Sequence, residues 1–194
     1  MCANHDDKTT DARLVRQLQA GETAAFEAIF ERYRRPLLAY VIKRTGDRAL
    51  AEDVVQESFV RLARHAARLN PRRSLSGWLF RVARNLAVDH ARRRQREVLV
   101  DTAPAPKPTR EAGPDAELRR RERRDAIERA MDALSERERD VLRLRFYGDL
   151  TFRDIAAATR RPLGTVLWQC RRALRKLREE MERTGADPSD WKEP

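Results

Sequence analysis

The sequence predicts an all-α fold with two small helical domains, joined by a flexible, Pro-rich linker. Three observations carry this prediction. Apolar residues recur three and four positions apart along most of the chain, and no segment alternates strictly enough for a strand. Four of the nine prolines fall within twenty residues of one another near the middle. We therefore expect a first domain at 10–96, the linker at 97–117, a second domain at 118–183 and a tail at 184–194.

The composition points to a nucleic acid as the partner. The chain has 194 residues and a net charge of +11, and 37 of its 42 Lys and Arg residues are Arg, which is suited to phosphate contacts. The positive charge falls in two blocks, +9 over residues 61–100 and +5 over residues 135–183. A solvated helix face is the simpler explanation for one such block, but two blocks within apolar-periodic helices favour DNA binding.

Other classes are disfavoured by the same composition. No apolar run approaches the roughly 20 residues of a membrane span, and the first thirty residues lack the apolar core of a signal peptide. Cys2 and Cys170 are too far apart in sequence for a zinc motif or a disulfide framework. We expect a cytoplasmic protein without membrane insertion, metal or other cofactor.

The first two helices of the N-terminal domain meet at a turn. Apolar residues recur from Phe26 to Val41, with a kink expected at Pro36 and a stop at Gly46. The next helix is expected over Arg48–Leu69, with Val55, Phe59 and Leu62 on its core stripe.

The opposite side of this second helix carries Asp53, Gln56, Glu57 and Val60. Solvent exposure alone would account for such a polar face. An apolar residue among carboxylates and an amide is also typical of a protein-docking surface.

A third helix, expected over 76–94, combines a core face with a basic stripe. Its stripe includes Arg81, Arg84, Asn85 and Arg92, and a polar loop with Asn70, Arg72 and Arg73 precedes it. Arginines can neutralise phosphates, and the amide of Asn85 has the donor and acceptor that reading a base edge requires.

The second domain has the pattern of a helix-turn-helix. Ser135 and Glu138 form a capping box, Thr151 caps a short helix, and a break at 159–161 precedes a longer basic helix. We expect Cys170 in the core of that helix. Its outer face and the preceding turn supply the candidate DNA contacts Arg160, Arg161, Thr165, Trp168, Gln169, Arg171, Arg172 and Arg175. Trp168 has two interpretations: contact with a thymine methyl, or packing against the turn.

Taken together, these segments resemble the extracytoplasmic-function (ECF) subfamily of the sigma-70 family of bacterial RNA polymerase sigma factors. The resemblance covers about residues 20–183 and is carried by AEDVVQESF (51–59), GWLFRVARN (77–85), LSERER (134–139) and PLGTV (162–166). The chain differs from the family's usual pattern at 159–161, where a small residue and a glycine are common, and at 167–169.

The resemblance implies a transcription initiation factor that binds core RNA polymerase and directs it to promoters. It implies that the 53–60 face docks on the clamp of the largest polymerase subunit, with the flap of the second-largest subunit as a further contact. The segment 69–96 matches the part that opens the −10 element and holds an extruded base at Asn85. The second domain matches the reader of the −35 element, and many relatives have an anti-sigma factor as partner.

Two other classes remain to be weighed against this interpretation. One is a helix-turn-helix transcriptional regulator that is not a polymerase subunit. It would explain the charge, but it gives no function to the acidic helix face or to the Asn85 stripe. A nucleic-acid enzyme is disfavoured because the three histidines are scattered and no glycine-rich phosphate loop is present. The adjacent Asp89 and His90 point about 100° apart on a helix, so we expect no catalytic residues.

Overall fold

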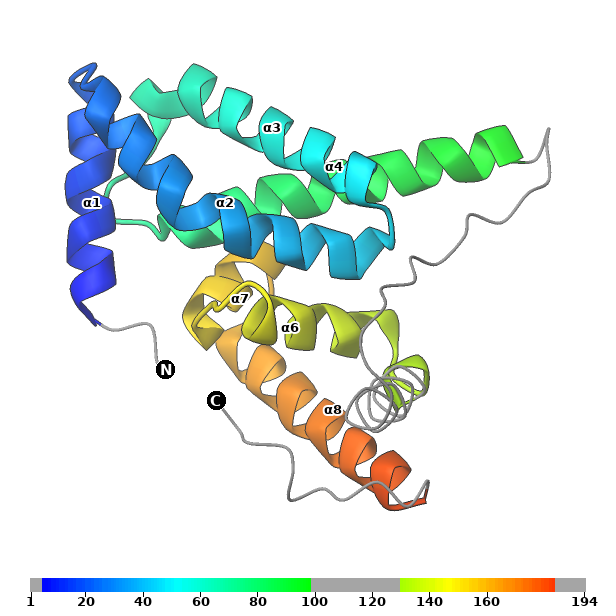
Figure 1. The fold of residues 1–194 in the computed structure, drawn as a ribbon. Helices are drawn as coiled ribbons and strands as arrows, with labels where there is room; N and C mark the ends of the chain where they lie inside the picture. The colour runs from blue at the N-terminus through cyan, green and yellow to red at the C-terminus, as the bar shows by residue number, and fades with distance from the viewer. Residues whose placement is uncertain (1–4, 99–129, 184–194) are drawn as a thin grey trace, which may run out of the picture.

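The structure is a computed structural model that describes residues 5–98 and 130–183. Within these two ranges every regular element is a helix, which confirms the predicted fold class (Figure 1). Apart from residues 97 and 98, the expected linker at 97–117 lies outside the described residues, as does the tail at 184–194.

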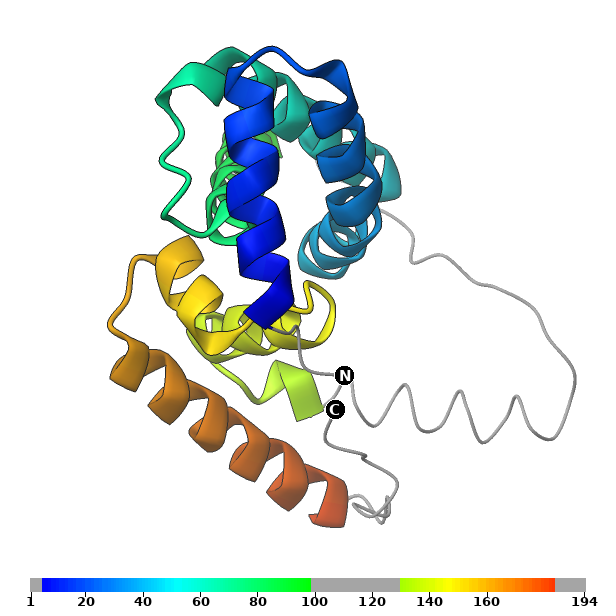
Figure 2. The same ribbon diagram turned by 90° about the vertical axis from the view of Figure 1, so that its left-hand side faces the viewer.

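The N-terminal unit packs its helices around one apolar centre (Figures 1 and 2). Its elements are α1 (His5–Gln19), α2 (Thr23–Thr45), α3 (Arg48–His65), the 3-10 turn η1 (Ala66–Arg68) and α4 (Leu75–Val98). The predicted core residues Val55, Phe59 and Leu62 are buried at this centre.

The turn between α2 and α3 follows from its residues. Gly46 adopts the left-handed conformation with φ of 71°, which ends α2 and which residues with a Cβ rarely adopt. Asp47 then caps α3 by accepting a hydrogen bond from the Leu50 backbone N–H. Pro36 lies inside α2, which runs past it without interruption.

Helix α3 ends four residues earlier than Leu69, where the sequence predicts its end. The last turn tightens, because the N–H of Ala66 bonds to the carbonyl of Ala63 and that of Leu69 to Ala66. The Gln19 side chain donates to the carbonyls of Ala66 and Leu69, which fixes the loop leading to α4.

The C-terminal unit contains α6 (Glu136–Phe146), α7 (Phe152–Thr159) and α8 (Leu163–Arg183). The predicted capping box of Ser135 and Glu138 is present, and Thr151 caps α7 as expected. Arg160 ends α7 in the left-handed conformation, φ 55°, within the turn at 159–161 where a small residue and a glycine are expected from the family resemblance. The short helix, tight turn and long helix of the predicted motif are therefore confirmed.

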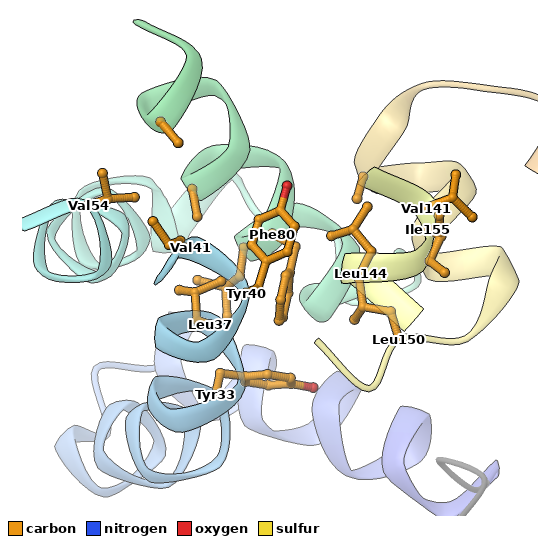
Figure 3. Close-up of a cluster of buried hydrophobic side chains, with 14 of the residues drawn as sticks. Tyr33, Leu37, Tyr40, Val41, Val54, Phe80, Val141, Leu144, Leu150 and Ile155 are labelled. Atoms are coloured by element: carbon orange, nitrogen blue, oxygen red, sulfur yellow. The ribbon is translucent and has the colours of Figure 1, made fainter. Parts of the chain in front are cut away.

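The two units pack against each other. Figure 3 shows Tyr40 and Phe80 between the core of α2, α3 and α4 on one side and Leu144 and Leu150 on the other. The backbone of Gly148 lies so close to Phe80 that a Cβ there would be 2.7 Å from the ring. In Figures 1 and 2, α6 and α7 lie directly against α2 and α4.

Candidate polymerase-docking and DNA-binding surfaces

The acidic face predicted on α3 lies at the surface. Asp53 and Gln56 are exposed, and Glu57 and Val60 are partly buried. Glu57 accepts a hydrogen bond of 2.8 Å from Arg61 one turn later, a surface ion pair of little stabilising value. Asp53 is therefore open to a partner, and the Glu57 carboxylate is 41% exposed although Arg61 pairs with it.

An apolar groove of about 700 Å³ runs beside this face between α2 and α3. Gln56 and Val60 lie on its wall. Its apolar lining is Phe26, Phe30, Leu38, Val55, Phe59, Val60 and Ala63, and its polar lining is Arg34, Arg48, Glu52, Gln56 and Arg64. Sequence reasoning found Val60 but missed the groove, because the phenylalanines of α2 look like ordinary core residues in a helical pattern.

On α4, Asn85 and Arg92 are exposed and Arg81 is partly buried. Arg81 lies in a second hollow, of about 730 Å³, which also includes Asn70 and Arg73 of the preceding loop. The Asn70 side chain accepts a hydrogen bond of 2.9 Å from the Arg72 backbone N–H, which folds this loop into a turn. The structure thus brings together three of the predicted −10 contacts, while Arg72 lies exposed beside them.

The outer face of α8 carries the predicted −35 contacts Thr165, Trp168, Arg171, Arg172 and Arg175, all of them exposed. Trp168 is 56% exposed, and the guanidinium of Arg172 stacks over its ring at 5.0 Å. Gln169 is buried instead, and it accepts a hydrogen bond of 3.1 Å from Arg161. Cys170 is buried in the core, as expected.

A buried ion-pair cluster joins the two units. The carboxylate of Asp140, on α6, accepts hydrogen bonds from Arg44 Nη1 (2.5 Å), Arg84 Nε (2.6 Å) and the Tyr40 hydroxyl (2.9 Å). Burial, and then Asp140, raises the pKa of Tyr40 well above its ordinary value, so Tyr40 keeps its proton and donates. Sequence reasoning missed Tyr40, Arg44 and Asp140. Asp140 lies one turn before the buried Leu144, and an acid on the buried face of a helix is a usable signal of a buried ion pair.

Arginines of the two candidate DNA surfaces face each other across this contact. The pKa of Arg81 is lowered, first by burial and then by the charges of Arg160 and Arg73. The pKa of Arg161 is likewise lowered by burial and then by Arg84. In both arginines burial is the larger cause, and a positive charge of the other unit adds to it.

Neither a metal site nor a membrane span is found in the described ranges 5–98 and 130–183. No group of three His, Cys, Asp or Glu side chains there could hold a metal ion. No described helix combines the length and the apolar character that crossing a bilayer requires.

Comparison with known proteins supports the same interpretation. The Sigma-70 region 2 family matches residues 29–97, and the Sigma-70 region 4 family matches residues 130–179. The ECF RNA polymerase sigma factor RpoE of Cereibacter sphaeroides is 30% identical over 183 residues, covering 90% of this chain and 97% of the relative. The ECF RNA polymerase sigma factor SigL of Mycobacterium tuberculosis is 33% identical over 168 residues, covering 86% and 94%.

Solved structures share the fold. CnrH, in complex with the cytosolic domain of CnrY, superposes with a TM-score of 0.65 at 22% identity, covering 89% of this chain and 97% of CnrH. The sigma factor RpoE of Bartonella quintana, in complex with the anti-sigma factor NepR, gives 0.61 at 23% identity, covering 81% and 96%. With its two matched regions and full-length relatives, the chain belongs to the ECF subfamily of the sigma-70 family, the transcription initiation factors that bring core RNA polymerase to promoters.

Proposed function

We propose that this sigma factor binds its partners through three surfaces. The α3 face and groove bind polymerase, α4 with its preceding loop binds the −10 element, and α8 binds the −35 element. The observation that carries the proposal is that the α3 face combines exposed carboxylates with an apolar groove, although Arg34, Arg48 and Arg64 also line that groove. The exposed acids of α3 lie beside an apolar groove, whereas exposed arginines line α8 and the loop before α4. An acidic face repels DNA and suits a protein partner, while a basic face suits a polyanion.

For polymerase docking, we assign Asp53, Gln56, Glu57 and Val60 to one continuous patch. Gln56 and Val60 form the edge of the groove, and the two carboxylates stand beside it. A helix of the polymerase clamp laid across this edge would bury apolar area in the groove and meet the carboxylates with basic side chains. The flap of the second-largest subunit is proposed to contact the C-terminal unit.

For the −10 element, we assign Asn70, Arg72, Arg73, Arg81, Asn85 and Arg92. The arginines and the loop follow the phosphates, and the exposed Asn85 amide reads a base that has left the stack. Opening the strands breaks base-pair hydrogen bonds but no covalent bond, so the factor works by binding and not as an enzyme.

For the −35 element, the exposed face of α8 enters the major groove of duplex DNA. Arg171, Arg172 and Arg175 are placed to meet phosphates or guanines, with Thr165 and Trp168 beside them. Arg160 and Arg161 hold the turn next to the backbone, and Gln169 acts through Arg161, to which it is bonded.

An anti-sigma factor is proposed as a competitor for the same groove. Two proteins of this fold are described in complexes, one with the cytosolic domain of CnrY and one with the anti-sigma factor NepR. An amphipathic helix that filled the groove here would exclude polymerase from Gln56 and Val60. We propose that the factor acts in the cytoplasm, together with core RNA polymerase and promoter DNA.

The decisive experiment reverses the docking carboxylates. Asp53→Lys with Glu57→Lys should strongly weaken assembly with core RNA polymerase, measured by co-purification and by fluorescence anisotropy. Because neither residue is in the core, the melting temperature should hardly change. The control is Glu27→Lys with Glu31→Lys, which changes the charge equally at two exposed acids of α2. If both double variants bind polymerase equally well, the docking assignment is wrong.

A further inference from the structure

The N-terminal unit contains an anion-binding cradle that the C-terminal unit fills with its own carboxylate. Tyr40 and Arg44 come from α2, and Arg84 comes from α4. Their three donors converge on Asp140, which comes from α6, and each donor lies within 2.9 Å of one of its two carboxylate oxygens. The cradle therefore belongs to one unit and its occupant to the other.

The burial of these groups shows that the cradle is suited to an anion. Asp140 is 1% exposed, and the side chains of Arg44 and Arg84 are 11% and 24% exposed. Two guanidinium groups directed at one point repel each other unless an anion lies between them. Separation of the units would leave this pair of cations, and the Tyr40 hydroxyl, without the carboxylate that now lies among them.

A phosphodiester has the properties that this site selects. It presents two oxygens and one negative charge, as a carboxylate does, and arginine binds both groups in the same bidentate manner. Arg84 also lies one turn after Arg81 on α4, so the cradle adjoins the surface proposed for the −10 strand.

The geometry points to a backbone-phosphate site for promoter DNA formed by Tyr40, Arg44 and Arg84, which Asp140 occupies while the two units are packed together. This inference rests on the proposed role of α4 in DNA binding, and it adds Tyr40 and Arg44 as contacts. The packed arrangement therefore masks this DNA-binding site, because DNA and Asp140 compete for the same cradle.

Repulsion between positive side chains of the two units favours the opening of the packed arrangement. Arg153 of α7 lines the same hollow as Arg73 and Arg81 of the N-terminal unit, so positive side chains of both units are held together. Asp140 offsets part of this repulsion. A polyanion that binds either surface removes the repulsion and replaces Asp140, which favours the separated state.

The masking is tested with the full-length protein and a fluorescent single-stranded oligothymidylate, whose affinity is followed by anisotropy. Asp140→Asn removes the charge of the carboxylate that contacts all three donors, while Glu136 stays 3.3 Å from Arg44 Nη1. Ala157→Leu changes no cradle residue. Ala157 of α7 packs closely on Gly77 of α4, since a Cβ built on Gly77 would lie 3.0 Å from the Ala157 Cβ, and a larger side chain at 157 should push the two helices apart. Ala157 is exposed, and leucine is a good helix former, so α7 should persist.

Both variants should bind the oligonucleotide about tenfold more tightly than wild type, a typical coupling between two equilibria. Their radius of gyration in small-angle X-ray scattering should increase. Unchanged affinity in both variants overturns the masking. Should Asp140→Asn fail to fold, Ala157→Leu decides the question, because it replaces no residue of the ion-pair cluster.

The phosphate site is tested in the Ala157→Leu background by adding Arg44→Gln. The slope of log affinity against log salt concentration should become shallower by about 0.7, the value for one phosphate of a single strand. Arg44→Lys should keep the wild-type slope, because lysine retains the charge. Arg13→Gln, at an exposed position of α1, is the matched control and should leave the slope unchanged.

Equal slopes for Arg44→Gln and Arg13→Gln overturn the phosphate site. Arg92→Gln, at an exposed position of the proposed −10 surface, separates the two proposals. If Arg92→Gln reduces the slope and Arg44→Gln does not, the cradle alone is wrong. If neither reduces it, the DNA-binding role proposed for α4 is wrong as well.

Discussion

Replacing Glu138 by Gln tests the ion-pair network that connects α6 to α8 in the helix-turn-helix unit. The Glu138 carboxylate accepts hydrogen bonds from the Ser135 backbone N–H (2.9 Å), the Ser135 hydroxyl (2.7 Å) and Lys176 Nζ (3.0 Å). It also lies 3.2 Å from Nε of Arg172, a candidate −35 contact. The substitution would keep the size of the side chain but remove its charge.

The magnitude follows from the pKa of Glu138. Burial alone would raise it, but the hydrogen bonds of Ser135 and Lys176 hold it at about 2, below the ordinary 4.5. A difference of this size corresponds to at most about 3 kcal/mol of stability. Because Lys176 and Arg172 are 30% and 43% exposed, water screens both cations, and we expect about 1–2 kcal/mol at pH 7.

The pH dependence has a definite sign. The folded pKa of Glu138 is lowered, so its stabilisation is present in full above pH 4.5 and is lost as the pH falls toward 2. Urea unfolding of wild type and Glu138→Gln, followed by far-UV circular dichroism at pH 7 and pH 3, measures this. The difference in free energy of unfolding between the two proteins should fall by about half at pH 3. An equal difference at both pH values would refute the reasoning, since other carboxylates titrate in both proteins.

Four further changes test individual residues. Asn85→Ala should leave polymerase assembly normal but lose about 1–3 kcal/mol of discrimination between −10 bases, measured with base-substituted templates in an open-complex assay. Trp168→Ala should weaken promoter binding by the holoenzyme at particular −35 bases; an unchanged base preference with a lower melting temperature would assign Trp168 to packing. Arg172→Ala should weaken DNA binding; if its contact is to phosphate, it should weaken binding to all −35 variants alike and lower the salt dependence by about one unit. Gly46→Ala should lower the free energy of unfolding by about 1–2 kcal/mol, measured in urea, because alanine is strained at φ 71°.

Features set by neighbouring residues could be predicted from the sequence. The Ser135 capping box, the Thr151 cap and the stop at Gly46 all depend on residues within one turn of a helix, and all three are present. Periodicity likewise identified the buried stripes of α3 and α8, because a side chain three or four positions away lies on the same face.

Features set by distant residues could not be predicted in this way. Tyr40 and Arg44 meet Asp140 from about a hundred positions away in sequence, and no local pattern encodes that pairing. Gln169 illustrates the same limit at shorter range. A helical wheel predicts Gln169 at the edge of the outer face, but the αL turn at Arg160 brings Arg161 over its amide and buries it.

The interface between the units connects stability with activity. Arg84 contributes to the packed arrangement through Asp140, and in the separated arrangement the same guanidinium is a candidate phosphate contact. Gly77 of α4 allows this close contact with α7. A Cβ at position 77 would lie 3.2 Å from the Asp154 carbonyl and would push α7 away. Substitutions that tighten this contact should therefore stabilise the free protein and weaken its binding to DNA. Polymerase has the opposite effect if it binds only the separated arrangement, because its binding energy then offsets the cost of breaking the contact.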